Sequence, residues 1–227
     1  MVSSNRVIFI SELVGTFGLL VAAAGSLVYD GRVGGTLGPV FIAAVHFVGL
    51  AIVVYSFSKY SMAHFNPAVT IGFFIAGYTE RKKLPIYFIA QSIGAFFGSA
   101  FVKYVIGDFA NLGINFANHS FSIDVIYGIE ILATVFLMGV ILIVVHAKSL
   151  KKFSGVAIGG IIALDVFFFG PISGASMNPI RSLSPAVLAS IYNDLWIYWS
   201  APFIGSILVA LFYKSKYVKK PTKVSKY

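Results

Sequence analysis

The 227-residue sequence contains no cysteine, and only 11% of its residues are charged. The lack of cysteine excludes a disulfide, a thiolate-held metal and a cysteine nucleophile. The scarcity of charge is unusual, because about 25% of the residues in a soluble domain are charged. With 58% hydrophobic residues and a mean hydropathy of +0.89, the chain carries more apolar surface than one soluble core can bury. The composition therefore predicts a protein of the lipid bilayer.

Long apolar runs indicate how the chain crosses the bilayer. A spanning helix needs about 20 apolar residues, whereas the strands of a membrane barrel alternate apolar and polar residues over about ten. Only these two designs satisfy every backbone polar group in lipid. The runs are unbroken, so we predict an all-α membrane protein. Six stretches are long enough to span: 7–28, 38–57, 84–106, 125–145, 153–169 and 195–213.

Two further apolar segments, 66–76 and 178–191, are too short to span, and each begins with Asn-Pro. Proline suits the first turn of a helix, where its missing N–H costs nothing. Each segment therefore predicts a half-helix that starts at its proline, Pro67 or Pro179. The preceding asparagine, Asn66 or Asn178, can cap the helix through its side-chain oxygen. Its amide nitrogen is then free to donate a hydrogen bond to a passing molecule.

The sequence repeats itself. ELVGT at 12–16 is echoed by EILAT at 130–134, NPAVT at 66–70 by NPIRS at 178–182, and AQSIG at 90–94 by APFIG at 201–205. We place two repeats, at about 7–107 and 125–213, within a single domain that covers 1–227. Each repeat holds three spans, an odd number, so the halves have opposite orientation. Such inverted repeats place the functional site at their interface near the bilayer midplane. There the half-helix N-termini, each carrying about half a positive charge, repel cations and protons.

The basic residues are unevenly distributed along the chain. If the N-terminus lies inside, all of them except Arg32, Lys103 and Arg181 fall in the inner segments. The positive-inside rule therefore places both termini in the cytoplasm. The basic tail at 214–227 fits this pattern and could contact lipid headgroups. We expect no nucleic-acid partner.

The two Asn-Pro segments carry a resemblance. Residues 65–70 read FNPAVT and residues 176–182 read SMNPIRS, and the pair resembles the Asn-Pro-Ala signatures of the aquaporin (major intrinsic protein) family. The resemblance covers about 7–213. It implies the aquaporin fold, a passive channel rather than an enzyme, no cofactor or metal, and a homotetramer with one pore per subunit. One departure is Ile180, which stands where Ala68 stands in the first motif. Since isoleucine is bulkier, we expect the half-helices to pack differently.

The resemblance also implies a selectivity filter, whose members lie at fixed offsets from the two asparagines. They are His46, Val166, Ala175 and Arg181. A charge such as that of Arg181 is costly inside a membrane and usually lines a water-filled route. Its guanidinium donates hydrogen bonds to a solute and repels cations. The buried carboxylates Glu12 and Glu130 are expected to support the re-entrant loops.

This filter differs from that of strict water channels, which carry an aromatic residue on span 2 and a histidine on span 5. A histidine on span 2 with a small residue on span 5 resembles plant vacuolar-membrane aquaporins, some of which pass ammonia. That subfamily also suggests His119 as an additional filter residue. Glycerol channels of the family carry Asp after the filter arginine and a basic residue four positions further on. Here Ser182 and Ala186 stand there. The expected solutes are therefore water and also ammonia, with glycerol or another small neutral solute as the alternative.

Two rival functions need residues that the spans hardly supply. A secondary transporter needs coupling-ion ligands, for which only Glu12, Glu130 and Asp165 are available, and Asp165 has no assigned role. A membrane enzyme needs a nucleophile with its base, or a metal cluster, and the four histidines fall in separate segments. The short termini suggest the plasma membrane of a prokaryote.

Overall fold

The computed structural model describes residues 4–218. Within them, six helices are long and apolar enough to cross a membrane, and no strand is present. The predicted all-α membrane fold is confirmed. The main helices are α1 (Asn5–Arg32), α2 (Gly38–Ser61), α3 (Pro67–Ile75), α4 (Leu84–Phe101), α5 (Ile123–His146), α6 (Ser154–Ser173), α7 (Pro179–Ala189) and α8 (Leu195–Tyr217).

Short helical turns join or extend these helices. They are η1 (Arg81–Lys83), η2 (Val102–Ile106), η3 (Ala110–Gly113) and η4 (Lys148–Phe153). Several long helices extend beyond the apolar runs that predict them. The helix α1, for example, continues through the polar residues Asp30 and Arg32. A helical backbone satisfies its own hydrogen bonds, so a helix can continue from the lipid into the aqueous phase.

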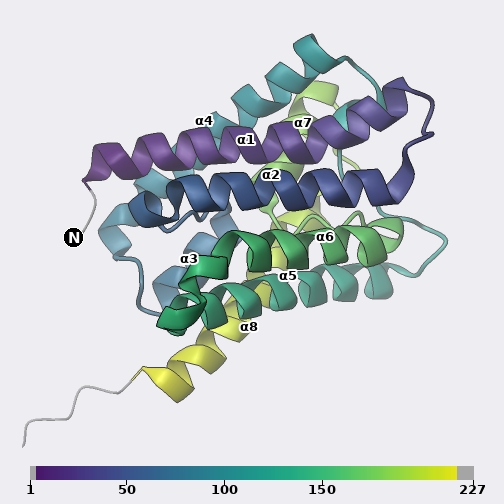
Figure 1. Cartoon of the computed structure of the whole chain (residues 1–227). Coiled ribbons are helices and arrows are strands. Elements are labelled where there is room, and N and C mark those ends of the chain that lie inside the picture. Colours follow the sequence, from purple (N-terminus) through teal and green to yellow (C-terminus); the bar gives the residue numbers. More distant parts are fainter. Residues whose placement is uncertain (1–3, 219–227) are drawn as a thin grey trace, which may run out of the picture.

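The two half-helices, α3 and α7, enter the bundle from opposite ends. The end of α3 lies near the end of α8, where Tyr78 hydrogen-bonds Tyr213 (O···O 2.6 Å). The end of α7 lies near the end of α4, where Lys103 Nζ donates to the carbonyl of Leu188 at 3.0 Å. We call the first end the N-terminal face, because α1 also begins there (Figure 1). The arrangement is that of two inverted repeats.

Equivalent glycines allow a close helix crossing in each of the two repeats. Gly94 brings α4 onto α1, where a Cβ atom would collide with the carbonyl of Leu13. Gly205 brings α8 onto α5, where a Cβ atom would collide with the carbonyl of Ile131. Small residues allow such backbone approach in membrane proteins. These glycines end the repeated segments 90–94 and 201–205, so the sequence repeat reflects a repeated packing contact.

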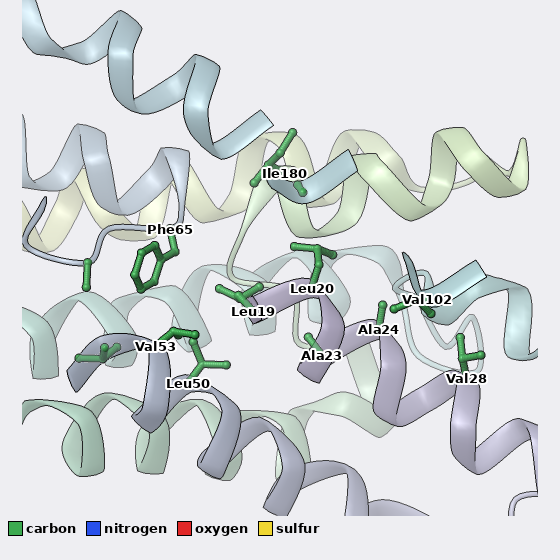
Figure 2. Close-up of a cluster of buried hydrophobic side chains, with 13 residues drawn as sticks. Leu19, Leu20, Ala23, Ala24, Val28, Leu50, Val53, Phe65, Val102 and Ile180 are labelled. Carbon is green, nitrogen blue, oxygen red and sulfur yellow. The ribbon is translucent and has the colours of Figure 1, made fainter. Parts of the chain in front are cut away.

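Ile180 points into an apolar core rather than into open space (Figure 2). It is buried in a cluster with Leu20 of α1, Phe65 of the first re-entrant loop and Ala95 of α4. Its counterpart Ala68 is fully buried, and its carbonyl accepts a hydrogen bond from Ser206 at 2.7 Å. The halves therefore differ here as expected, because the larger side chain fills a core position beside α1.

The N-terminal face carries most of the described basic residues. Residues 214–217, which the sequence places in the tail, continue α8 instead. The rest of the predicted tail, from residue 219 onward, lies outside the described residues. At the other face, α1 ends with Arg32, and η2, which continues α4, carries Lys103. The expected cytoplasmic position of both termini rests on this uneven distribution of basic residues between the two faces.

Candidate functional site

A narrow channel runs through the centre of the bundle. The space that it offers to the centres of water molecules is only about 50 Å³, compared with about 250 Å³ in the cavity toward the opposite face and about 370 Å³ in the cavity toward the N-terminal face. The channel shares lining residues with both cavities, so the three form one route. The residues shared with the cavity toward the N-terminal face are Val54, Ala63, Ile141 and Ile158.

The predicted filter residues lie where the route narrows. His46, Val166 and Arg181 line both the narrow channel and the cavity of the opposite face. Ala175 lines the channel just inside them. The fold thus brings together four residues that the sequence separates by up to 135 positions, which is 181 minus 46. The arrangement presents to a solute one basic side chain, one imidazole and two small aliphatic side chains.

The two asparagines of the Asn-Pro motifs also line the channel and cap their half-helices. Oδ1 of Asn66 accepts from the N–H of Ala68 at 2.8 Å, and Oδ1 of Asn178 accepts from that of Ile180 at 3.2 Å. One amide hydrogen of each asparagine is engaged as well, because Nδ2 of Asn66 donates to the carbonyl of Met177 and Nδ2 of Asn178 to that of Phe65. We expected both N–H groups of each asparagine amide to be free for a solute. This is corrected, because only one N–H of each amide remains unengaged.

The loops that precede the asparagines have backbone conformations that L-residues rarely adopt. Phe65 and Met177 have φ angles of 49° and 54°, and Ala63 and Ala175 have 53° and 44°. Such residues cost free energy, of order 1–3 kcal/mol each, unless their surroundings hold them. The four angles are paired at the same spacing in the two repeats. Each half of the channel thus contains the same strained turn.

Two buried glutamates hold these strained turns. Glu12 accepts hydrogen bonds from the backbone N–H groups of His64 (2.9 Å) and Phe65 (2.8 Å). Glu130 accepts from those of Ser176 (2.9 Å) and Met177 (3.2 Å). Hydroxyl groups complete both sites. Each carboxylate, wholly buried, therefore gains the hydrogen bonds that a buried charge requires.

Arg181 is oriented by a loop residue that the sequence analysis did not single out. Its Nη1 donates to the carbonyl of Gly113 at 3.0 Å and to Oδ1 of Asn115. Asn115 in turn donates through Nδ2 to the carbonyl of Gly174 at 2.7 Å. Ser182 donates to the same Oδ1 at 2.7 Å. No motif marks Asn115, because it lies 66 positions before Arg181 in an irregular segment, so only the folded chain reveals it.

The histidines of the channel present acceptors in their neutral form. Nδ1 of His46 lies 2.8 Å from the carbonyl of Ile42, which can only accept, so Nδ1 is the protonated nitrogen and Nε2 is left as an acceptor. Nδ1 of His64 lies 3.1 Å from the hydroxyl of Thr70, which already donates to the carbonyl of Asn66. By the same argument, Nε2 of His64 is an acceptor. The channel therefore offers an acceptor from His46 beside the donors of Arg181 at the constriction, and one amide donor from each asparagine deeper in. Nε2 of His64, by contrast, is buried, with the ring stacked between Phe73 and Tyr87.

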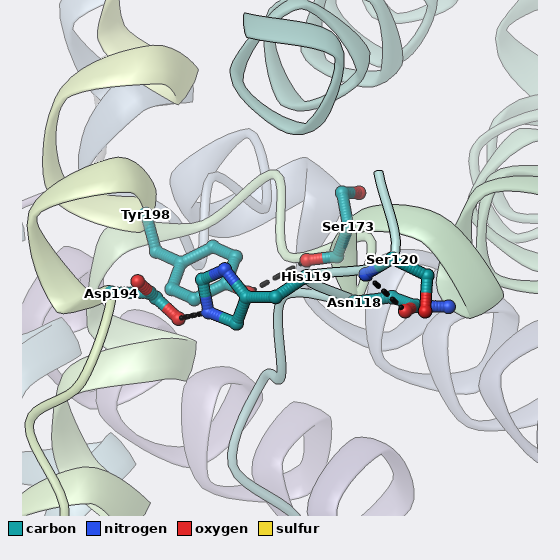
Figure 3. Close-up of polar contacts among 6 residues, drawn as sticks. All are labelled: Asn118, His119, Ser120, Ser173, Asp194 and Tyr198. Atoms are coloured by element: carbon teal, nitrogen blue, oxygen red, sulfur yellow. Dashed lines mark hydrogen bonds and ion pairs between the residues drawn. The ribbon is translucent and has the colours of Figure 1, made fainter. Parts of the chain in front are cut away.

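His119 does not belong to this channel. Its Nε2 lies 2.7 Å from Oδ2 of Asp194, and its side chain is 65% exposed (Figure 3). It lines neither the narrow channel nor the cavity of the opposite face. The expected role in an extended filter is corrected, because the contact with Asp194 at the start of α8 holds the ring outside the route. The neighbouring Phe116 lines that cavity instead.

Asp165 lies beside the filter residue Val166 but not in the channel lining. It is 2% exposed, and its Oδ2 has no hydrogen-bond partner among the described residues. The contrast with Glu12 and Glu130 is clear, because each of those carboxylates accepts several hydrogen bonds. Asp165 therefore supports no loop.

The sequence was compared with known proteins. Residues 2–213 match the family described as Major intrinsic protein. The chain belongs to the major intrinsic protein family. It is thus an aquaporin-type membrane channel and not an enzyme.

Two similar proteins come from plants, and a similar solved structure comes from Plasmodium falciparum. The chain is 38% identical to a protein named "Probable aquaporin NIP7-1" of Arabidopsis thaliana, over 92% of this chain and 76% of that protein. It is 32% identical to aquaporin NIP1-2 of Oryza sativa subsp. japonica, over 98% of this chain and 76% of that protein. The fold is similar to the X-ray structure of the aquaglyceroporin from Plasmodium falciparum, with a TM-score of 0.80, 26% identity and coverage of 94% and 97% of the two chains.

These relatives change two expectations. The likeness to plant vacuolar-membrane aquaporins is corrected, because the relatives are NIP-type aquaporins. A likeness at four filter positions carries little weight against similarity over more than 200 residues. These two relatives come from plants, so they also give no support to a prokaryotic source.

Proposed function

We propose that this channel conducts small neutral solutes with hydroxyl groups, of which glycerol is the simplest probe, together with water. The observation that carries the proposal is the filter geometry. Val166 and Ala175 are small and leave room beside His46 and Arg181, which together offer an acceptor and several donors. A hydroxyl group both donates and accepts, so it can bind both groups at once. The likeness to a protein named as an aquaglyceroporin supports the same class of solute.

The sequence features that argue against glycerol carry less weight in the folded chain. Ser182 and Ala186 do not line the channel. The hydroxyl of Ser182 is engaged with Asn115 and Ser176, and Ala186 is a buried residue of α7 itself. Neither position touches the route of a solute. The alternative that the sequence analysis names is therefore the better proposal, and water selectivity is not proposed.

Ammonia is a second candidate, supported by one observation. The free Nε2 of His46 faces the route as an acceptor, and ammonia donates hydrogen bonds.

Protons and cations are expected to be excluded by Arg181 and by the two half-helix N-termini, whose positive dipole ends meet at Asn66 and Asn178. The proposed orientation places both termini in the cytoplasm. We further propose a homotetramer, which light scattering of the purified protein would reveal.

The test is stopped-flow light scattering on proteoliposomes, with glycerol, water and ammonia gradients in parallel. The wild type should accelerate glycerol entry over protein-free liposomes. The double variant H46F/V166H recreates the arrangement of strict water channels, with an aromatic residue on α2 and histidine on α6. It should lose glycerol flux by at least about tenfold, the effect of filling a pocket by a few atoms, while water flux persists. Wild-type liposomes that pass water but not glycerol would refute the proposal.

A further inference from the structure

A separate cavity lies at the N-terminal face, outside the narrow channel. It has about 230 Å³ of space for the centres of water molecules, and it is enclosed by the beginning of α1, the end of α2, the segment between α3 and η1, and the beginning of α4. None of the filter residues or channel asparagines lines it. It is therefore a distinct site that conduction does not explain.

Three polar side chains of this cavity, Ser61, Tyr78 and Tyr87, are already hydrogen-bonded. The hydroxyl of Ser61 donates to Glu12 at 2.6 Å, and that of Tyr87 donates to the carbonyl of Ser61 at 2.7 Å. The hydroxyl of Tyr78 is paired with Tyr213 at 2.6 Å. These three groups hold the walls together and are not available to a ligand.

A second set of lining groups has no such partner in the described part of the chain. The hydroxyl of Thr79 is buried without a hydrogen bond, although the residue is only 7% exposed. The ammonium groups of Lys59 and Lys83 form no ion pair within residues 4–218. Nζ of Lys59 lies 4.6 Å from the ring centre of Tyr60, which also lines the cavity. Lys59 is exposed and Lys83 is half-buried, so of these three groups the hydroxyl of Thr79 is the buried one, and a buried donor left unsatisfied is costly.

The cavity has an excess of positive charge. Its single carboxylate, Glu80, is already paired with Lys82 at 2.8 Å, and both side chains project into solvent. The hydrogen bond and charge of Lys82 hold the pKa of Glu80 below its usual value, so this ion pair persists at neutral pH. The charge of Lys83 also acts on Glu80 without forming an ion pair with it, so Lys59 and Lys83 leave the cavity with an excess of positive charge.

We propose that this cavity binds a phosphate group, held by the ammonium groups of Lys59 and Lys83 and by the hydroxyl of Thr79. A phosphate supplies several strong acceptor oxygens and negative charge, and lysine binds it as a point charge. The cavity lies at the ends of membrane-spanning helices, where a bilayer of ordinary thickness has its headgroups. The phosphate can therefore come from an anionic lipid or from a free ion.

Binding there would reach the mouth of the channel. Lys59 and Met62 line this cavity and also the one through which the channel opens at the N-terminal face. A phosphate that holds Lys59 would fix its charge beside that opening. Occupancy of the site by phosphate would therefore act on the charge at the channel entrance.

The test uses the purified full-length protein and a matched control. In K59Q/K83Q, two of the proposed contacts are removed. In K214Q/K216Q, the same charge is removed from exposed residues of α8 at the same face, outside the cavity. Native mass spectrometry after purification from phosphatidylglycerol-containing vesicles counts retained lipid, and thermal unfolding in detergent measures stabilisation by inorganic phosphate against chloride.

We expect one anionic lipid to be retained, or phosphate to raise the unfolding temperature, in the wild type and in K214Q/K216Q but not in K59Q/K83Q. T79V should weaken binding severalfold without changing charge. Lipid retention alone identifies a headgroup site, and stabilisation by phosphate alone identifies a free-ion site. Equal losses in the two lysine pairs, or no binding of either probe, would overturn the proposal. Solute flux is measured separately, so a failure of the proposed conduction leaves this test intact.

Discussion

Asn66 and Asn178 bind each other's loops across the centre of the channel. Nδ2 of Asn66 donates to the carbonyl of Met177 at 2.7 Å, and Nδ2 of Asn178 donates to the carbonyl of Phe65 at 2.9 Å. Each asparagine thereby caps its own half-helix and secures the residue that precedes the other asparagine. The two halves of the channel are locked to each other at the point where their dipoles meet.

Replacement of Asn178 by aspartate should break this lock. A carboxylate cannot donate to the carbonyl of Phe65, and its negative charge opposes the positive helix ends that exclude cations. We expect N178D to lower the unfolding temperature and to admit protons or cations. Dye-loaded proteoliposomes measure the proton leak. N5D, a change of the same type at an exposed position, is the control, and a proton-tight N178D would contradict the dipole argument.

Asn115 should matter for the filter although it is remote in sequence. In N115A, Arg181 keeps the carbonyl of Gly113 but loses its side-chain acceptor, and Ser182 loses the same partner. The loss of a buried hydrogen bond to a charged group costs about 1.5–3 kcal/mol. We expect reduced selectivity between glycerol and larger polyols, measured by stopped-flow scattering. If N115A retains wild-type ratios, the carbonyl alone positions the arginine.

A cysteine placed in the channel should create sensitivity to mercurials. The wild type has no cysteine, so mercuric ion should leave its flux unchanged. In A175C the thiol faces the narrow channel, and a bound mercury atom should block both water and glycerol. V40C, on a side chain that is 69% exposed, is the control. Block of the wild type, or lack of block in A175C, would argue against the assigned lining.

The buried carboxylates should differ in their importance for stability. In E12Q, an amide replaces one of the oxygens that accept from Ser61, His64 and Phe65, and each donor left without a partner costs about 1–3 kcal/mol. D165N removes no observed hydrogen bond of Oδ2. We expect a clear drop in unfolding temperature for E12Q and little or none for D165N. The reverse order would show that Asp165 has a partner in the membrane.

Ile180 offers a test of core packing apart from conduction. I180A restores the residue found in the first motif and empties a position beside Leu20 and Phe65. Such truncations cost roughly 2–5 kcal/mol in well-packed cores. Thermal unfolding should therefore shift downward, while the ratio of glycerol to water flux stays unchanged, because Ile180 does not line the channel. A changed ratio would mean that the core position also shapes the route.

Much of this protein follows from the sequence alone. The six spans, the two half-helices and their inverted relation follow from apolar length, Asn-Pro placement and repeat spacing, because a lipid environment permits so few backbone designs. The filter residues were located by offsets from Asn66 and Asn178, and the fold places all four along one route. These features depend on local sequence or on a resemblance carried by two motifs.

The tertiary structure decided the rest, because it depends on contacts between distant segments. Only the fold shows that Asn115 orients Arg181 and that His119 turns to Asp194 instead of the route. Only the fold separates Asp165, which lacks a partner for Oδ2, from the hydrogen-bonded Glu12. A carboxylate, an amide or an imidazole has the same chemistry wherever it occurs, and its role is set by which groups the packed helices bring within hydrogen-bond distance.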